Sequence, residues 1–390
     1  MSDLQSDVAS KPRSFVTLDL LRGIAALSVL QVHTGAKLGL SSSLANHALS
    51  VDFFLMLSGF MMTHAYQERL DNGWGTAAFV RARILRLYPL YLVGTVLGIL
   101  FVILRMVSGH LKTTPGEIAM LALLGVFFLP IPPSPLFPTA PIAIYPFDMP
   151  AWSLWYQLVG YAVHGTFLRR RGPSVLGGLA LFFGLILLPV TIGHGVDDFG
   201  PNREDYFFAF CRVMFAYPVG MILHRVWNSG RFRIHLHPLV VGAFFLLVMA
   251  TPVPPGLQAV YTWFAIILLL PTVILLAADA RRVGRMMQIF KWIGGLSFPL
   301  YILHLPVFDF FEVAWLRVTR LPVEQAAPWS GFCYLLVVVP TAFFVGKLYD
   351  PQARKLLQVH VIPAASRILL DRRRSREAAR LQKLVTDGNL

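Results

Sequence analysis

The sequence predicts an all-α, polytopic integral membrane protein, and its composition carries most of that prediction. Of the 390 residues, 56% are hydrophobic and 14% are charged, whereas a soluble domain has about 25% charged residues. The mean hydropathy is +0.63. Several apolar runs also approach the length of about 20 residues that a helix needs to cross a bilayer. A soluble globular enzyme, a coiled coil, a disordered chain and a small disulfide scaffold are therefore excluded.

The chain carries a formal net charge of +14, and its basic residues lie in short loops and in the C-terminal tail. Basic residues beside apolar spans suit anionic lipid or a phosphorylated substrate better than a nucleic acid, so no nucleic-acid partner is expected. Cys211 and Cys333 both fall in apolar stretches, which indicates neither a disulfide framework nor a metal site. The first apolar run contains Arg22 and His33, so no cleavable signal peptide is expected.

We expect about ten transmembrane helices plus one re-entrant or broken segment. The ten ranges are Leu18–Leu38, Val51–Tyr66, Leu87–Val107, Ala151–Leu168, Val175–Ile192, Tyr206–His224, Leu239–Pro252, Ala259–Ala278, Trp292–Phe311 and Ser330–Leu348. Glu117–Leu129 is apolar enough to enter the membrane, but the dense prolines of Pro130–Pro150 exclude a regular helix there. Irregular backbone at membrane depth must be surrounded by protein or line a water-filled cavity.

The distribution of basic residues predicts the orientation of these spans. Basic clusters lie at Lys11–Arg13, Arg81–Arg86, Arg169–Arg171, Arg231–Arg233 and Arg281–Lys291. Cytoplasmic loops are enriched in Lys and Arg, so these loops and both termini are expected in the cytoplasm. The acidic stretch His194–Asp205 and the proline-rich stretch Thr251–Gly256 are then expected outside.

This pattern divides the chain into three parts. Residues 1–17 form an N-terminal cytoplasmic segment, residues 18–349 form the membrane domain, and residues 350–390 form a basic, amphipathic tail. The tail alternates Arg and Lys with Leu, Ile and Val, which is typical of a helix that lies on anionic lipid.

The first span contains the most informative pair of polar residues. Arg22 and His33 are eleven residues apart, which places both side chains on one helical face about 16 Å apart along the axis. That separation would suit the two ends of one long ligand. The alternative is that Arg22 pairs with Asp19 and that His33 lies at headgroup level.

The start of the second span is expected to pack closely against another helix. Ser58 and Gly59 permit close approach of two helices, and Asp52 can cap the outer end of this one. A packing interface with a cap is therefore the simplest interpretation.

An arginine cluster stands at the predicted cytoplasmic end of the third span. Arg83 and Arg86 share one helical face, and Arg81 lies nearby. Guanidinium groups bind phosphate oxygens in a bidentate manner. The same cluster could also be an ordinary anchor at the inner surface.

Two later spans begin or continue with polar residues. Trp152-Ser153-Leu154 leads to Gln157 in the span from Ala151, where tryptophans are commonly only an interfacial belt. His304 falls in the middle of another span, where a hydrogen-bonded structural histidine is the simplest interpretation.

Taken in this order, the segments resemble the membrane-bound acyltransferase 3 family, over nearly the whole chain from Leu18 to about Leu357. Arg22 and His33 match the arginine-to-histidine spacing of that family. Phe53–Phe60 is similar to its phenylalanine-rich Ser-Gly-Phe signature, Arg83–Pro89 to its two-arginine motif, and Leu296–Pro306 to its late Ser-aromatic, Tyr-Leu and His-x-Pro segment.

The resemblance implies a stand-alone O-acyltransferase of a bacterial-type cytoplasmic (inner) membrane. The donor would be cytoplasmic acyl-CoA, expected to be acetyl-CoA, used as a co-substrate with no tightly bound cofactor and no metal. The acceptor would be a hydroxyl of a cell-surface or exported glycan, such as an exopolysaccharide, or of a lipid-linked saccharide.

The resemblance also assigns roles to residues. His33 would remove the acceptor proton or briefly carry the acyl group, and Arg22 would steady the donor. Arg83 and Arg86, with Arg81 as a weaker candidate, would bind the donor phosphates. A further set would support the site: Asp19, Ser58, Trp152, Gln157 and His304.

One residue departs from the family pattern, because Gln157 stands where the family usually has a glutamate. An amide keeps the shape and hydrogen bonding of a carboxylate but cannot ionise. This leaves open a slow, altered or inactive enzyme. A secondary transporter or glycan flippase, which would also need polar residues in its spans, is the principal alternative, and a non-catalytic scaffold or sensor is a third.

Overall fold

The computed structural model describes residues 15–38, 44–111, 113–132, 143–194, 200–281 and 283–361. These residues form helices and no strand, with one isolated bridge between Ala143 and Asn202. The helices are α1 (Val16–Gly35), α2 (Leu49–Asp71), α3 (Thr76–Val107), α4 (Pro115–Val126), α5 (Ala151–Thr166), α6 (Pro173–His194), α7 (Tyr206–Asn228), α8 (Pro238–Ala250), α9 (Gln258–Phe264), α10 (Leu270–Asp279), α11 (Met286–Thr319), α12 (Trp329–Phe344) and α13 (Asp350–Leu356).

Short helical segments of other types connect some of these helices. Single 3₁₀ turns occur at Leu168–Arg170, Arg203–Asp205, Pro255–Leu257 and Val323–Ala326. The π-helical residues Ala265–Leu269 join α9 to α10, and Val345–Tyr349 join α12 to α13. The last helix therefore continues without a break from Trp329 into the predicted tail, as far as Val361.

The all-α membrane fold is confirmed. Seven helical stretches of the described chain are long and apolar enough to cross a membrane: Val16–Gly35, Thr76–Val107, Pro173–Ile192, Arg203–Asn228, Pro255–Asp279, Met286–Thr319 and Trp329–Val359. The other three predicted spans coincide with α2, which contains many polar residues, and with α5 and α8, which have 16 and 13 residues. The total of ten spans stays a prediction.

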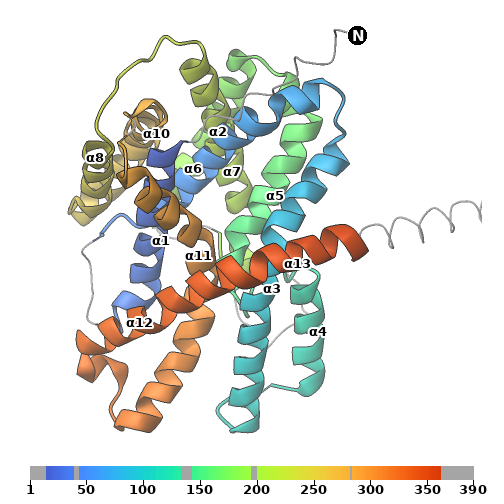
Figure 1. Cartoon of the computed structure of the whole chain (residues 1–390), viewed down its shortest axis with the longest axis vertical. Helices are drawn as coiled ribbons and strands as arrows, with labels where there is room; N and C mark the ends of the chain where they lie inside the picture. Colours follow the sequence, from blue (N-terminus) through green and yellow to red (C-terminus); the bar gives the residue numbers. More distant parts are fainter. Residues whose placement is uncertain are drawn as a thin grey trace, which may run out of the picture.

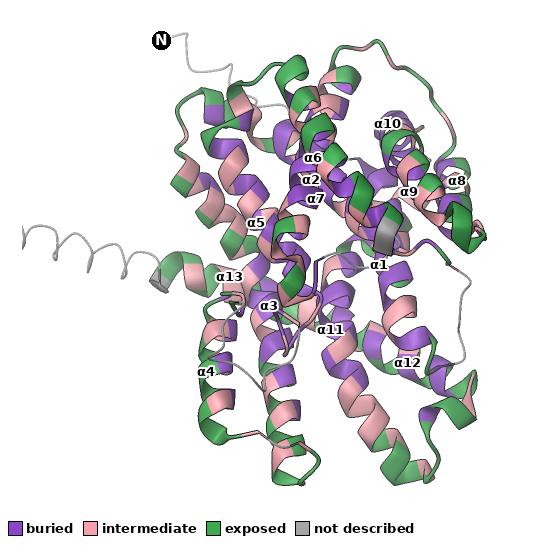
Figure 2. Cartoon of the chain, turned by 180° about the vertical axis from the view of Figure 1, so that it is seen from behind, coloured by how far each residue is buried: buried purple, intermediate pink, exposed green. Residues whose placement is uncertain are grey.

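The helices α1 and α11 pack along each other near the centre of the bundle (Figure 1). Around them, α2 packs along α7, α6 covers α7, and α3 contacts both α5 and α11. Figure 2 shows buried residues facing the middle of the bundle and exposed residues on its outer faces. Leu181, Phe182 and Leu185 on α6 are 57–64% exposed, as expected for side chains that face lipid rather than water.

Glycines allow the central helices to approach closely. A side chain at Gly59 of α2 would collide with the Tyr217 carbonyl of α7, and one at Gly220 of α7 would collide with the Met56 carbonyl of α2. The predicted close packing at Gly59 is therefore observed. Similarly, Gly294 of α11 leaves room for Asp19 of α1, which fixes the position of Asp19 beside the candidate site.

The capping role predicted for Asp52 is wrong. Ala48 is the N-cap residue of α2, with no side-chain cap. The carboxylate of Asp52 instead accepts hydrogen bonds from the Arg212 guanidinium of α7, at 2.8 Å from Nε and 2.9 Å from an Nη atom. Both residues are buried, so Asp52 forms an ion pair between helices rather than a helix cap.

The region predicted as re-entrant or broken contains α4 and an irregular return that packs against α3. Ile131 and Ile144 are joined by a backbone hydrogen bond, and both are buried. Phe147 lies against Gly98 of α3, where any side chain would collide with its carbonyl. Much of the described part of this irregular backbone is therefore packed against protein, although Leu129 and Pro132 are exposed. Residues 133–142 lie outside the described chain. So do the N-terminal residues 1–14 and the tail beyond residue 361.

Candidate active site

A cavity of about 380 Å³, called here the first cavity, opens between α1, α2, α3, α5 and α11. Its walls combine aromatic and hydroxyl side chains with three arginines, Arg22, Arg83 and Arg86. Of the carboxylates in the described chain, only Asp19 lines it. The lining therefore carries a net positive charge, which favours an anionic ligand.

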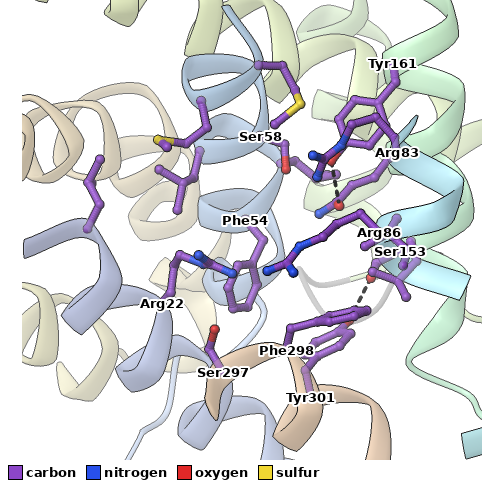
Figure 3. Close-up of a pocket in the computed structure, with 18 of the residues that line it drawn as sticks. Arg22, Phe54, Ser58, Arg83, Arg86, Ser153, Tyr161, Ser297, Phe298 and Tyr301 are labelled. Carbon is purple, nitrogen blue, oxygen red and sulfur yellow. Dashed lines mark hydrogen bonds between the residues drawn. The ribbon is translucent and has the colours of Figure 1, made fainter. Parts of the chain in front are cut away.

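The three arginines reach this cavity from two helices that are far apart in sequence. Figure 3 shows Arg22 of α1 and Arg86 of α3 pointing towards each other, with Arg83 beside Tyr161. Arg22 donates from Nη1 to Asp19 at 3.4 Å, so the alternative pairing considered for Arg22 is present as well. Within the described chain, Arg86 forms no hydrogen bond or ion pair. Its guanidinium is thus available to a ligand.

Two tyrosines hold Arg83 in place. Its guanidinium lies over the rings of Tyr161 and Tyr66, at 5.2 and 5.8 Å from their centroids, and it donates to the Tyr66 hydroxyl at 3.5 Å. Such contacts stabilise a cation without neutralising its charge. Arg83 is therefore a positioned cation.

The predicted supporting residues divide between the cavity and the surrounding protein. Ser58 and Gln157 line the cavity, and Gln157 Oε1 accepts a hydrogen bond from the Tyr161 hydroxyl at 3.2 Å. Trp152 is buried beside Gly200 and does not line the cavity. Arg81 is exposed and also lies outside the cavity.

His33 lies in the last turn of α1, whereas Arg22 lies nearer the start of that helix, and His33 does not line the first cavity. Its Nδ1 is 2.8 Å from Nε2 of His304 on α11, so the fold joins two candidate residues that are 271 positions apart. His304 is completely buried, and its Nδ1 is 2.9 Å from the Tyr301 carbonyl oxygen.

These contacts define which nitrogens carry hydrogen when both imidazoles are neutral. A carbonyl oxygen only accepts, so His304 donates from Nδ1 to Tyr301 and holds its lone pair on Nε2. His33 must then donate from Nδ1 to His304, which leaves the basic lone pair of His33 on Nε2. The arrangement can position an imidazole as a general base.

The sequence analysis did not name Tyr66, Tyr161, Ser153 or Tyr301 as site residues, although Ser153 and Tyr301 lie within the motifs that it quoted. Ser153 and Tyr301 hydroxyls are 2.8 Å apart and join α5 to α11 at the cavity wall. Tyr161 could have been found from its spacing, because it follows Gln157 by four residues and so lies on the same helix face. Within the described chain, no three His, Cys, Asp or Glu residues gather as a metal site would require.

The fold and site thus define a polytopic helical membrane protein with a cationic cavity among its helices. The chain belongs to the acyltransferase 3 family, because residues 15–347 match the family described as an acyltransferase domain. It is similar to "Protein 2 in picA locus" of Rhizobium radiobacter, with 37% identity over 170 residues, which is 41% of this chain and 86% of that protein. No solved structure matches the chain. The protein is a membrane acyltransferase.

Proposed function

We propose that this acyltransferase takes its acyl group from acyl-CoA, expected to be acetyl-CoA, and transfers it to a hydroxyl of a cell-surface or exported glycan or of a lipid-linked saccharide. The proposal rests on one observation: a single cavity is lined by Arg22, Arg83 and Arg86. Guanidinium groups recognise phosphate oxygens well, and acyl-CoA is a phosphate-bearing acyl donor.

In the proposed reaction, Nε2 of His33 takes the proton from the acceptor hydroxyl. The acceptor oxygen attacks the thioester carbonyl carbon, and the carbon–sulfur bond breaks. The thiolate of CoA then leaves and receives the proton from His33. Arg22 shares a helix face with His33 and would steady the donor between the cavity and the imidazole. Transient acylation of His33 is the alternative route.

The proposal is tested by incubating the purified, reconstituted protein with labelled acetyl-CoA and a membrane saccharide fraction. We expect label in the saccharide and free CoA thiol in equal amounts. Movement of saccharide across the bilayer without release of CoA would instead indicate a transporter or flippase.

The phosphate role of the arginines gives a prediction for binding. Arg86→Ala should weaken CoA binding by about 10- to 100-fold, because hydrogen bonds to charged groups contribute about 1.5–3 kcal/mol. Arg83→Ala should also weaken it. Arg81→Ala should change affinity by less, since Arg81 is exposed outside the cavity. Isothermal titration of each variant with CoA would measure this, and unchanged affinity in Arg86→Ala would contradict the role.

Gln157 gives a prediction for catalysis. A carboxylate at this position would still accept from Tyr161 and would lie in a cavity lined by three arginines and one described carboxylate. Gln157→Glu is therefore expected to raise the transfer rate, by about tenfold if the carboxylate takes part in proton transfer. This increase in the transfer rate should disappear at low pH, because the carboxylate then becomes protonated.

Steady-state kinetics of both forms across a pH range would measure the gain. Gln157→Leu is the matched control, because it keeps the approximate shape without hydrogen bonding. If Gln157→Glu had the rate and pH profile of the unmodified protein, Gln157 would be a packing residue.

We further propose that the enzyme lies in a bacterial-type inner membrane with both termini in the cytoplasm and with its basic tail on anionic lipid. Single cysteines at the exposed positions Glu204 and Arg231, with Cys211 and Cys333 replaced, would test the orientation. An impermeant maleimide should label position 204 in intact cells and position 231 only after permeabilisation. The reverse pattern would place the arginine cluster away from cytoplasmic acyl-CoA.

A further inference from the structure

A second cavity, of about 590 Å³, adjoins the first. The two cavities share Asp19, Arg22, Arg86 and Phe298. The remaining wall of the second cavity comes from the start of α11 and from the region where α12 passes into α13. Figure 1 shows α13 crossing α3, and these two helices are in contact. A ligand too long for one cavity could therefore occupy both.

The second cavity is strongly cationic. It is lined by five basic residues, namely Arg22, Arg86, Lys291, Arg354 and Lys355, and of the described carboxylates only by Asp19 and Asp350.

The two carboxylates already have partners. Asp350 forms an ion pair with Arg354, and Asp19 pairs with Arg22. Arg86, Lys291 and Lys355 form no ion pair or hydrogen bond within the described chain. Three positive charges therefore remain for a ligand that carries several negative charges.

The two cavities differ in chemistry. The first cavity combines its arginines with aromatic and hydroxyl side chains, including Phe54, Tyr301 and Ser153. The second has flexible ammonium groups at an accessible wall, since Lys291 and Lys355 are both exposed. Ammonium groups on flexible stems bind phosphates as point charges. The more strongly anionic end of a ligand therefore fits the second cavity, and the part with fewer charges and more apolar surface fits the first.

We propose that the second cavity binds the nucleotide end of the acyl donor, with Lys291 and Lys355 as phosphate-binding residues and Arg86 at the boundary between the two cavities. This assignment rests on the proposed function, because it takes acyl-CoA as the donor. The 3′-phosphate of the nucleotide end occupies the second cavity, and the diphosphate lies where the two cavities meet and is bound by the arginines of the first cavity. The pantetheine arm extends from the first cavity towards His33.

The test uses the full-length protein purified in detergent and titrated with CoA, dephospho-CoA and pantetheine. Lys291→Gln and Lys355→Gln should each weaken CoA binding by about five- to tenfold and leave pantetheine binding unchanged. Lys291→Arg should keep most of the affinity, because it keeps the charge. Lys347→Gln is the matched control, since Lys347 is an exposed lysine of the same continuous helix that lies outside the cavity.

Normal CoA affinity in both glutamine variants would overturn the assignment while leaving the proposed function intact. If the unmodified protein failed to bind CoA, the proposed donor itself would be wrong. A phospholipid headgroup is the other source of phosphate. If phosphatidylglycerol in nanodiscs stabilised the unmodified protein but not the glutamine variants, with CoA affinity unchanged, the cavity would be a lipid site and the assignment would be overturned.

Discussion

Replacing His33 by alanine is expected to lower the rate of acyl transfer by about 10²- to 10⁴-fold, the usual contribution of a general base. The lone pair of His33 is oriented by a buried partner, because His304 accepts from its Nδ1 at 2.8 Å. CoA binding should persist, since the arginines of the first cavity do not depend on the imidazole. The measurement is single-turnover transfer at saturating acetyl-CoA, together with CoA titration.

A second substitution separates chemistry from lost packing. His33→Asn keeps a donor near the position of Nδ1, so the contact with His304 can persist, but it provides no base at the position of Nε2. We expect the same loss of rate as in His33→Ala, with thermal stability close to that of the unmodified protein. Substantial activity in His33→Asn would remove His33 from proton transfer.

His304 is expected to act as a positioning residue. His304→Gln should lower the rate and move the acidic limb of the pH–rate profile, which reports the protonation of His33, because the tautomer of His33 would no longer be fixed. A purely structural role would lower stability without moving that profile.

The sequence predicted those parts of the site that depend on one helix. The spacing of Arg22 and His33 within α1 and that of Arg83 and Arg86 within α3 follow from helical periodicity, which is set locally. Gly59 was also predicted correctly, because a glycine in a span favours close helix packing wherever its partner comes from.

Features that depend on two distant helices were not predictable in the same way. Nothing near His33 indicates that its partner is His304, since the contact forms only when α1 packs against α11. The basic residues Lys291 and Lys355 were interpreted as part of a cytoplasmic loop and of a lipid-binding tail, and only the fold places them around one cavity. The prediction for Asp52 was wrong because a carboxylate in the first turn of a helix resembles a cap in the sequence. In the structure, this carboxylate forms an ion pair with Arg212 of another helix instead.

Loss of the buried Asp52–Arg212 ion pair is expected to have a large effect on the stability of the protein. Arg212 donates two hydrogen bonds to the carboxylate of Asp52 and one to the Ala48 carbonyl at 2.8 Å. Asp52 and Arg212 are 4% and 7% exposed. Asp52→Ala would leave a buried guanidinium without its counter-ion, and breaking a buried pair in this way destabilises a protein by about 3–5 kcal/mol. We expect a marked drop in thermal unfolding temperature in detergent and a smaller yield of folded protein.

The matched comparisons distinguish loss of the ion pair from loss of a side chain. The double substitution Asp52→Leu with Arg212→Met replaces both charges by apolar groups and should recover most of the lost stability, because no unpaired charge remains buried. The exposed pair Lys37–Glu312, whose side chains are 48% and 32% exposed, provides a control, and Glu312→Ala should change stability by about 1 kcal/mol or less. If Asp52→Ala unfolded at the temperature of the unmodified protein, or if the double substitution were less stable than Asp52→Ala, the pair would not hold α2 against α7.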